Sequence, residues 1–206
     1  MSENFYQIYN QSIKDPEKFW QKASEDIFWF KKPTKILNKS NPPFYKWYED
    51  GVTNTCFNAL DFHIEQGKGG KIALIYDSPI TGNKNKFTYE ELRLKVSKFA
   101  GALKKQGIEK GDRVIIYMPM IPEAVISMLA CARIGAIHSV VFGGFASNEL
   151  ASRIDDSKAK LLVTASCGFE PGRTVEYKPL VDEAIKQANH KIERVILFQR
   201  KDHEVK

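Results

Sequence analysis

Short apolar runs alternate with longer amphipathic stretches along most of the chain. The continuous apolar character of the runs is typical of parallel strands that are buried on both faces. They predict five strands, at residues 71–77, 113–118, 136–142, 160–165 and 194–198. Strands that alternate with helices in this way predict an α/β fold.

The stretches between the strands carry the start and stop signals of helices. Thr88, followed three residues later by Glu91, fits a capping box, and Gly107 suits the position after the helix end. Pro122 at a first helical position and Gly135 at the end bracket a second helix. Two more helices are predicted, one after the glycines at 143–144 and one at about 178–188.

The predicted fold class is therefore α/β, with repeated βα units that form a mostly parallel sheet flanked by helices. Three βα units are legible between residues 71 and 172. Residues 78–86 contain Pro79 and Gly82 and predict a turn, after which Phe87 belongs to the return strand of a hairpin.

An aromatic-rich extension precedes this domain. Asp15-Pro16 suits the cap and first position of a helix. Residues 28–60 combine aromatic and turn residues, so we expect little regular secondary structure there. We expect this segment to pack against the following domain, and a membrane- or partner-binding patch is the alternative. The predicted domains are the extension, residues 1–66, and the α/β domain, residues 67–206.

Composition argues against several classes of function. The 206 residues carry a net charge of +6 with scattered lysines, so we expect a solvated basic surface and no nucleic-acid partner. The three cysteines lack Cys-x-x-Cys spacing, which fits a reducing compartment and argues against a zinc site or disulfides. No apolar run approaches the ~20 residues that span a bilayer, so no membrane partner is expected.

Two glycine-containing turns follow predicted neighbouring strands and form the candidate ligand site. Gly143 and Gly144 either let the backbone approach an anion closely or form a tight turn that needs a positive φ. The pattern is not Gly-x-Gly-x-x-Gly, so the dinucleotide fingerprint fails. The second turn is a loop with Gly172 and Arg173, whose planar guanidinium either binds phosphate or is simply exposed. We expect an anion crevice here, because ligands bind at the carboxyl ends of strands in open α/β sheets.

Other polar groups indicate no catalytic centre. Asp155 and Asp156 are interpreted as a solvated helix end, and His138 as a hydrogen-bonded core histidine. No Ser-His-Asp spacing or Gly-x-Ser-x-Gly elbow is present, and the four histidines show no metal-ligand spacing.

Long strings of this chain match a known family. The strongest is YMPMIPEAVISMLACARIGAIHSVVFGGFASNELASRIDDSKAK at 117–160. Supporting strings are DPEKFW at 15–20, TYEELRLKVSKFAGALKKQGIEKGDRV at 88–114, and FEPGR at 169–173, together with PPFYKWYEDGVTNTCFNALD and YKPLVDEAI. From about residue 6 to 190 the chain resembles the short-chain acyl-CoA synthetases, the acetyl- and propionyl-CoA synthetases of the adenylate-forming superfamily.

The resemblance implies a CoA-binding site made of two segments. They are Phe142, Gly143 and Gly144, and Glu170, Pro171, Gly172 and Arg173. The acetyl branch has an Arg-Gly-Gly-Arg loop, and the Glu-Pro-Gly-Arg form resembles the propionyl-CoA synthetase branch. Because Glu170 repels phosphate, Arg173 is the expected charge partner.

The resemblance also implies a two-step reaction. ATP adenylates a short-chain carboxylate with release of pyrophosphate, and the CoA thiol then displaces AMP. CoA, ATP and the carboxylate are small-molecule substrates, and Mg²⁺ accompanies ATP. The family's phosphate loop, adenine motif, ribose aspartate, hinge and catalytic lysine are absent from these 206 residues. The chain therefore resembles the N-terminal third of a synthetase, and we expect it to have no catalytic residue, no tightly bound substrate and no activity alone.

The sequence is compatible with one alternative function and argues against another. A non-catalytic CoA- or nucleotide-binding module is the alternative, and the missing fingerprint disfavours a nicotinamide-dependent oxidoreductase. The first residues lack the apolar core of a signal peptide and contain acidic residues without arginine. We therefore expect a cytoplasmic location, with the mitochondrial matrix as the alternative that the resemblance allows.

Overall fold

A computed structural model of the chain describes residues 3–201. The chain divides into two compact units, Met1–Asn58 and Ala59–Lys206. The division between extension and α/β domain after residue 66 stays a prediction.

The first unit contains little regular structure after its two helices. These are α1 (Glu3–Lys14), which was not predicted, and α2 (Pro16–Ala23). The Asp15 carboxylate accepts a hydrogen bond from the Lys18 N–H at 3.2 Å, so the predicted cap is confirmed. A 3₁₀ turn and two very short strands follow, Ser24–Asp26, β1 (Leu37–Asn38) and β2 (Lys46–Trp47). The rings of Phe28, Phe30 and Phe57 pack with centroids 4.7–5.1 Å apart.

The second unit begins within irregular helical turns, which are followed by a hairpin. The helical turns include π-helix at Phe57–Asp61 and at Ile64–Lys68. Strands β3 (Ile72–Ser78) and β4 (Asn83–Thr88) then form an antiparallel pair, which confirms the predicted hairpin. The prediction of three βα units is wrong at its first member, because β3 pairs with β4 and lies outside the parallel sheet.

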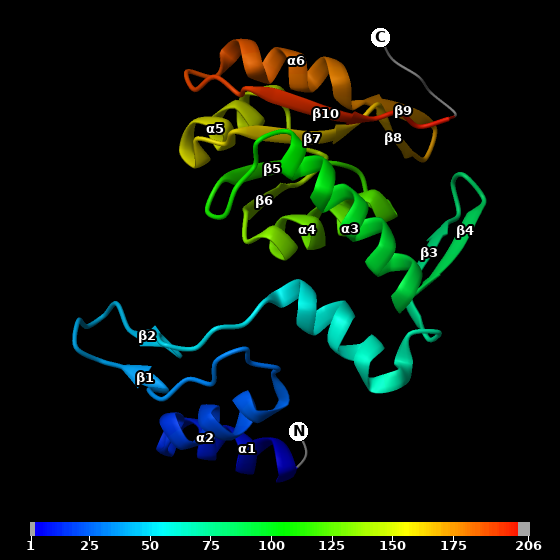
Figure 1. Cartoon of the computed structure of the whole chain (residues 1–206). Helices are drawn as coiled ribbons and strands as arrows, with labels where there is room; N and C mark the ends of the chain where they lie inside the picture. The colour runs from blue at the N-terminus through cyan, green and yellow to red at the C-terminus, as the bar shows by residue number, and fades with distance from the viewer. Residues whose placement is uncertain (1–2, 202–206) are drawn as a thin grey trace. The chain divides into compact units, whose positions relative to one another are not determined.

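A four-stranded parallel sheet forms the centre of this unit, in the order β10-β7-β5-β6. The strands are β5 (Arg113–Tyr117), β6 (Ile137–Val141), β7 (Leu161–Ala165) and β10 (Arg194–Phe198). The helices are α3 (Tyr89–Lys105), α4 (Pro122–Ile134), α5 (Ser147–Ser157) and α6 (Tyr177–Gln187). Figure 1 shows α3 and α4 on one side of the sheet and α5 and α6 on the other. The predicted α/β class, a parallel sheet flanked by helices, is confirmed.

The central strands are buried because helices cover both of their faces. All five residues of β7 are buried, as are four of the five in β5. On the α5/α6 side, Ile115, Tyr117 and Leu162 pack against Leu150 and Val181 in one apolar cluster. In the described part of the chain, β6 pairs with β5 alone, and its exposed outer edge contrasts with the buried centre.

The predicted helix signals form as expected at α3. The Thr88 hydroxyl accepts from the Glu91 N–H at 3.2 Å, and the Glu91 carboxylate accepts from the Thr88 N–H at 2.8 Å. At the end of α4, Gly135 takes a φ of 76°, where a residue with a Cβ would be strained. None of the helices within residues 3–201 is long and apolar enough to cross a membrane.

Candidate functional site

The sheet order creates a topological switch point. The connection through α4 carries the chain from β5 to β6, and the connection through α5 then carries it across to β7, on the opposite side of β5. In open α/β sheets the loops diverge at such a point and leave a crevice beyond the carboxyl ends of the strands. A ligand site is therefore expected where β5, β6, β7 and β10 end.

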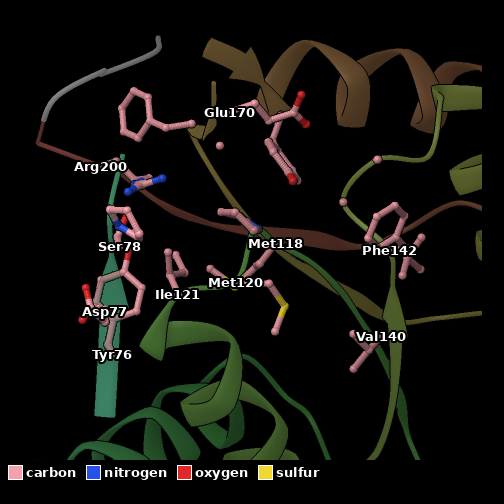
Figure 2. Close-up of a pocket in the computed structure, with 18 residues that line it drawn as sticks. Tyr76, Asp77, Ser78, Met118, Met120, Ile121, Val140, Phe142, Glu170 and Arg200 are labelled. Atoms are coloured by element: carbon pink, nitrogen blue, oxygen red, sulfur yellow. The ribbon is translucent and has the colours of Figure 1, made fainter. Parts of the chain in front are cut away.

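A pocket of about 390 Å³ lies at this edge, within the range of roughly 300–1,000 Å³ that is typical of small-molecule sites. Residues that follow all four strands contribute to it, together with the end of β3. In Figure 2, Arg200 and Phe142 lie on opposite sides of the pocket, with Met118 and Met120 between them. The other lining residues are Tyr76, Asp77, Ser78, Pro79, Pro119, Ile121, Val140, Val141, Gly143, Gly144, Gly168, Phe169, Glu170 and Tyr177.

The turn after β6 needs its glycines for space. Neither Gly143 nor Gly144 has a positive φ, so the interpretation as a turn that needs positive φ is wrong. A Cβ on Gly143 would lie 2.0 Å from the Tyr177 hydroxyl oxygen, and a Cβ on Gly144 would lie 2.6 Å from the Phe142 ring. The close approach expected here is thus made to aromatic side chains of the protein.

A pair of tyrosines fixes this turn. The Tyr117 hydroxyl donates to the Phe145 carbonyl at 2.7 Å, and the Tyr117 and Tyr177 ring centroids are 4.9 Å apart. Burial raises the pKa of Tyr117, and burial together with the neighbouring Tyr117 raises the pKa of Tyr177 to about 12. Both hydroxyls therefore stay protonated near neutral pH and can donate hydrogen bonds.

The segment after β7 is a β-hairpin, so the prediction of an irregular loop there is wrong. Strands β8 (Cys167–Glu170) and β9 (Arg173–Glu176) pair antiparallel. Pro171 and Gly172 are the two central residues of the turn, and Gly172 has a φ of 77°. Proline followed by a glycine with positive φ is typical of a type II turn.

The hairpin divides the predicted CoA-binding residues into two groups. Phe142, Gly143, Gly144 and Glu170 line the pocket, whereas Pro171, Gly172 and Arg173 are not among its lining residues. The Arg173 side chain is 71% exposed, and its guanidinium lies 2.6 Å from the Glu170 carboxylate. The predicted phosphate partner is thus already paired with the glutamate that replaces the family's arginine.

Tyr177 and Arg200 are among the lining residues that were not predicted from the sequence. Arg200 follows β10 and is only 9% exposed. Its backbone N–H donates to the Ser166 hydroxyl at 3.0 Å, and its guanidinium lies 4.4 Å from the centroid of the Phe169 ring. The position of Arg200 depends on the parallel pairing of β10 with β7, which places Phe198 opposite Ala165. The sequence alone does not reveal this pairing.

Other predicted polar groups lie outside this site. His138 is exposed on the edge strand β6, so the interpretation as a core histidine is wrong. The Asp155 carboxylate accepts from the His190 N–H at 2.7 Å and from the Asn189 side chain at 2.9 Å, and these contacts lower its pKa. Within residues 3–201, no three His, Cys, Asp or Glu side chains gather as a metal site would require.

The fold and the pocket together define a doubly wound α/β domain with a small-molecule pocket at its switch point. A family model described as "AMP-binding enzyme" matches residues 62–206, and the chain belongs to this family. A second model, described as "Acetyl-coenzyme A synthetase N-terminus", matches residues 5–59. The resemblance seen in the sequence is therefore confirmed.

Curated relatives are similar over nearly the whole chain. The human protein "Acyl-CoA synthetase short-chain family member 3, mitochondrial" is 58% identical over 193 residues, which are 94% of this chain and 28% of the relative. An uncharacterized protein of Pseudomonas aeruginosa is 50% identical over 95% of this chain and 31% of its own length. "Acetyl-coenzyme A synthetase" of Streptomyces coelicolor is 46% identical over 97% of this chain and 30% of its own length. The chain thus spans about 30% of the length of these relatives.

Proposed function

We propose that this chain is the N-terminal portion of a short-chain carboxylate–CoA ligase. In this proposal residues 1–66 are the synthetase-type extension, and residues 67–206 are the first part of the adenylate-forming domain. The family match at 62–206 and the synthetase relatives support it. The reaction of the whole enzyme is then carboxylate, ATP and CoA to acyl-CoA, AMP and pyrophosphate, through an acyl-adenylate.

The role proposed for this portion is a half-site for CoA. One observation carries it: the turn after β6 and the hairpin after β7 reach a single pocket at the carboxyl ends of the strands. The proposed contacts are Phe142, Gly143, Gly144, Glu170, Pro171, Gly172 and Arg173. The first three and Glu170 line the pocket, and Arg173 lies beside it on the hairpin through its ion pair with Glu170.

The proposed acid is propionate or acetate, and the Glu170-Pro171 form of the loop, which resembles the propionyl-CoA synthetase branch, favours propionate. Mg²⁺ is expected to arrive with ATP. No residue of this chain is assigned to it, since residues 3–201 hold no cluster of metal-ligating side chains.

We propose that the 206 residues alone catalyse neither step, because the phosphate loop, the adenine motif and the catalytic lysine are not among them. An ATP–pyrophosphate exchange assay with acetate and with propionate is expected to give no signal above a protein-free blank. Robust exchange by the purified chain contradicts this part of the proposal.

Isothermal titration calorimetry with CoA tests the half-site. Binding that Arg173→Ala weakens and that Arg93→Ala leaves unchanged supports it. Arg93 is a suitable control, because it is exposed on α3, outside the pocket. A CoA site without exchange activity also agrees with the alternative, a non-catalytic CoA- or nucleotide-binding module. The exchange assay, repeated with a longer chain that continues beyond residue 206, separates the ligase from the binding module, because only the ligase gains exchange activity.

The mitochondrial matrix is the proposed location. The word "mitochondrial" in the names of the human and bovine relatives supports it over the cytoplasm. Imaging of a C-terminally tagged chain in its own cells tests this proposal, and a diffuse cytoplasmic signal contradicts it.

A further inference from the structure

The two carboxylates that line the pocket have cationic partners, whereas the arginine that lines it has no anionic partner among residues 3–201. Three lining residues carry charge, Asp77, Glu170 and Arg200. Lys84 lies 2.9 Å from the Asp77 carboxylate, and Arg173 lies 2.6 Å from the Glu170 carboxylate. Arg200 has no carboxylate within ion-pair distance among residues 3–201. Each carboxylate thus has its own cation, and the remaining charge of the lining is positive.

Burial makes this charge significant. Arg200 is 9% exposed, and a buried guanidinium without a counter-ion is costly unless an anion can reach it. The only side-chain hydrogen bond that the described residues offer it is to the Cys167 carbonyl, at 3.4 Å, and its other face lies on the Phe169 ring. Four of its five N–H donors therefore remain for a ligand. Figure 2 shows its guanidinium directed into the pocket.

A second donor stands at the same pocket. The Tyr177 hydroxyl has no hydrogen-bond partner within residues 3–201, although Tyr177 is only 6% exposed. Burial raises the pKa of Tyr177, and the positive charge of Arg200 acts in the opposite direction and lowers it. A guanidinium fork and a neutral hydroxyl together suit the oxygens of a phosphate group.

We propose that Arg200 and Tyr177 form a phosphate-binding subsite inside this pocket, distinct from the exposed Arg173. Its ligand is a phosphate group of a nucleotide such as CoA or ATP. The subsite rests on the proposed function in taking CoA as the first candidate. Arg173 and Arg200 then hold different phosphate groups, one at the rim and one inside.

The test is calorimetric titration of the 206-residue chain with CoA, ATP and inorganic pyrophosphate. Arg200→Met keeps a long apolar side chain on Phe169 and removes the charge, and it is expected to weaken binding by roughly 10- to 100-fold. Tyr177→Phe keeps the ring packing and removes one neutral hydrogen bond, so a loss of about 2- to 10-fold is expected. Arg93→Met, on the exposed face of α3 and outside the pocket, is the matched control for pyrophosphate, whose affinity it should leave unchanged. The relative affinities for CoA and ATP identify the nucleotide.

The outcomes separate the subsite from the half-site. Pyrophosphate binding that depends on Arg200, without any CoA binding, supports the subsite and contradicts the CoA assignment. CoA binding that Arg173→Met weakens but Arg200→Met does not overturns the subsite and leaves the half-site standing. No binding of any of the three ligands by the wild-type chain overturns both. If Arg200→Met does not fold, Tyr177→Phe decides, and unchanged affinity in that variant overturns the subsite.

Discussion

A single methyl group at Gly143 tests whether the turn after β6 is packed against Tyr177. A Cβ at this position would lie 2.0 Å from the Tyr177 hydroxyl oxygen and 2.9–3.0 Å from its nearest ring carbons. Real Cβ atoms do not approach heavy atoms so closely, so either the turn or the ring must move in Gly143→Ala.

The ring has little room to withdraw. Tyr177 is only 6% exposed, and its ring packs on that of Tyr117 at 4.9 Å between centroids. The opposite edge of the ring lies over Gly168, where a Cβ would be 2.8 Å away. Overpacking of this kind costs about 1–3 kcal/mol. At about 2–4 °C per kcal/mol for a chain of this size, the expected fall in Tm is roughly 2–12 °C.

The assay is thermal unfolding followed by circular dichroism, in a double-mutant cycle with Tyr177→Phe. The second change removes the oxygen that the new methyl meets first and leaves Cζ at 2.9 Å. Gly143→Ala should therefore cost less in the Tyr177→Phe background, with a coupling of about 0.5–3 kcal/mol.

Gly101→Ala is the matched control. Gly101 lies inside α3 with no heavy atom within 4 Å of an added Cβ, so alanine should stabilise the helix by about 0.5–1 kcal/mol. If Gly143→Ala unfolds at the wild-type temperature, or if its cost is the same with and without the Tyr177 hydroxyl, the packing argument is refuted.

Three further predictions concern stability and reactivity. Thr88→Ala removes the capping box of α3 and should cost about 1 kcal/mol in urea unfolding, and a cost near zero contradicts the role of the cap. Hydrogen bonds from the Glu109 N–H and from Lys160 lower the pKa of Asp112 below 3.8. This carboxylate therefore stabilises the fold above that pH, and its contribution is lost as the pH falls through the lower folded-state pKa. The wild type should lose more stability than Asp112→Asn between pH 5 and 3, and parallel curves of stability against pH for the two proteins contradict the assignment. All three cysteines are buried, and burial raises the pKa of Cys131 to about 12, so a thiol reagent at pH 8 should label none of them before unfolding, and rapid labelling of the native chain contradicts their burial.

The parallel sheet could be predicted because its local signals agree with the tertiary fold. The strands at 113–118 and 160–165 are buried on both faces, and unbroken apolar runs between helices are typical of such strands. The cap at Thr88 and the stop at Gly135 were equally visible, since each depends on residues within one turn of helix.

The features that were missed depend on distant neighbours or on weak local patterns. The strands of the β8–β9 hairpin are only four residues long and barely alternate, although Pro171-Gly172 was a turn signal that could have been used. The first strand resembles the others in sequence, and only its pairing partner places it outside the parallel sheet.

The pocket shows the same division. Phe142, Gly143 and Gly144 were found because strand-end glycines are visible in a sequence. Arg200 stands in a polar stretch, and its burial follows from the register between β10 and β7, which no local pattern records. The contact between Tyr177 and Gly143 likewise needs α6 to fold back over the turn.

The exposed edge of β6 has a consequence for handling this chain in solution. The strand IHSVV contains no lysine, glutamate or proline, the residues by which natural sheets block edge-to-edge pairing. Its Ile137 and Val140 are each 55% exposed, and within residues 3–201 no second strand covers them. Two copies can therefore extend each other's sheets through β6. Aggregation at high protein concentration should begin at this strand, and Val140→Lys is the substitution that should suppress it.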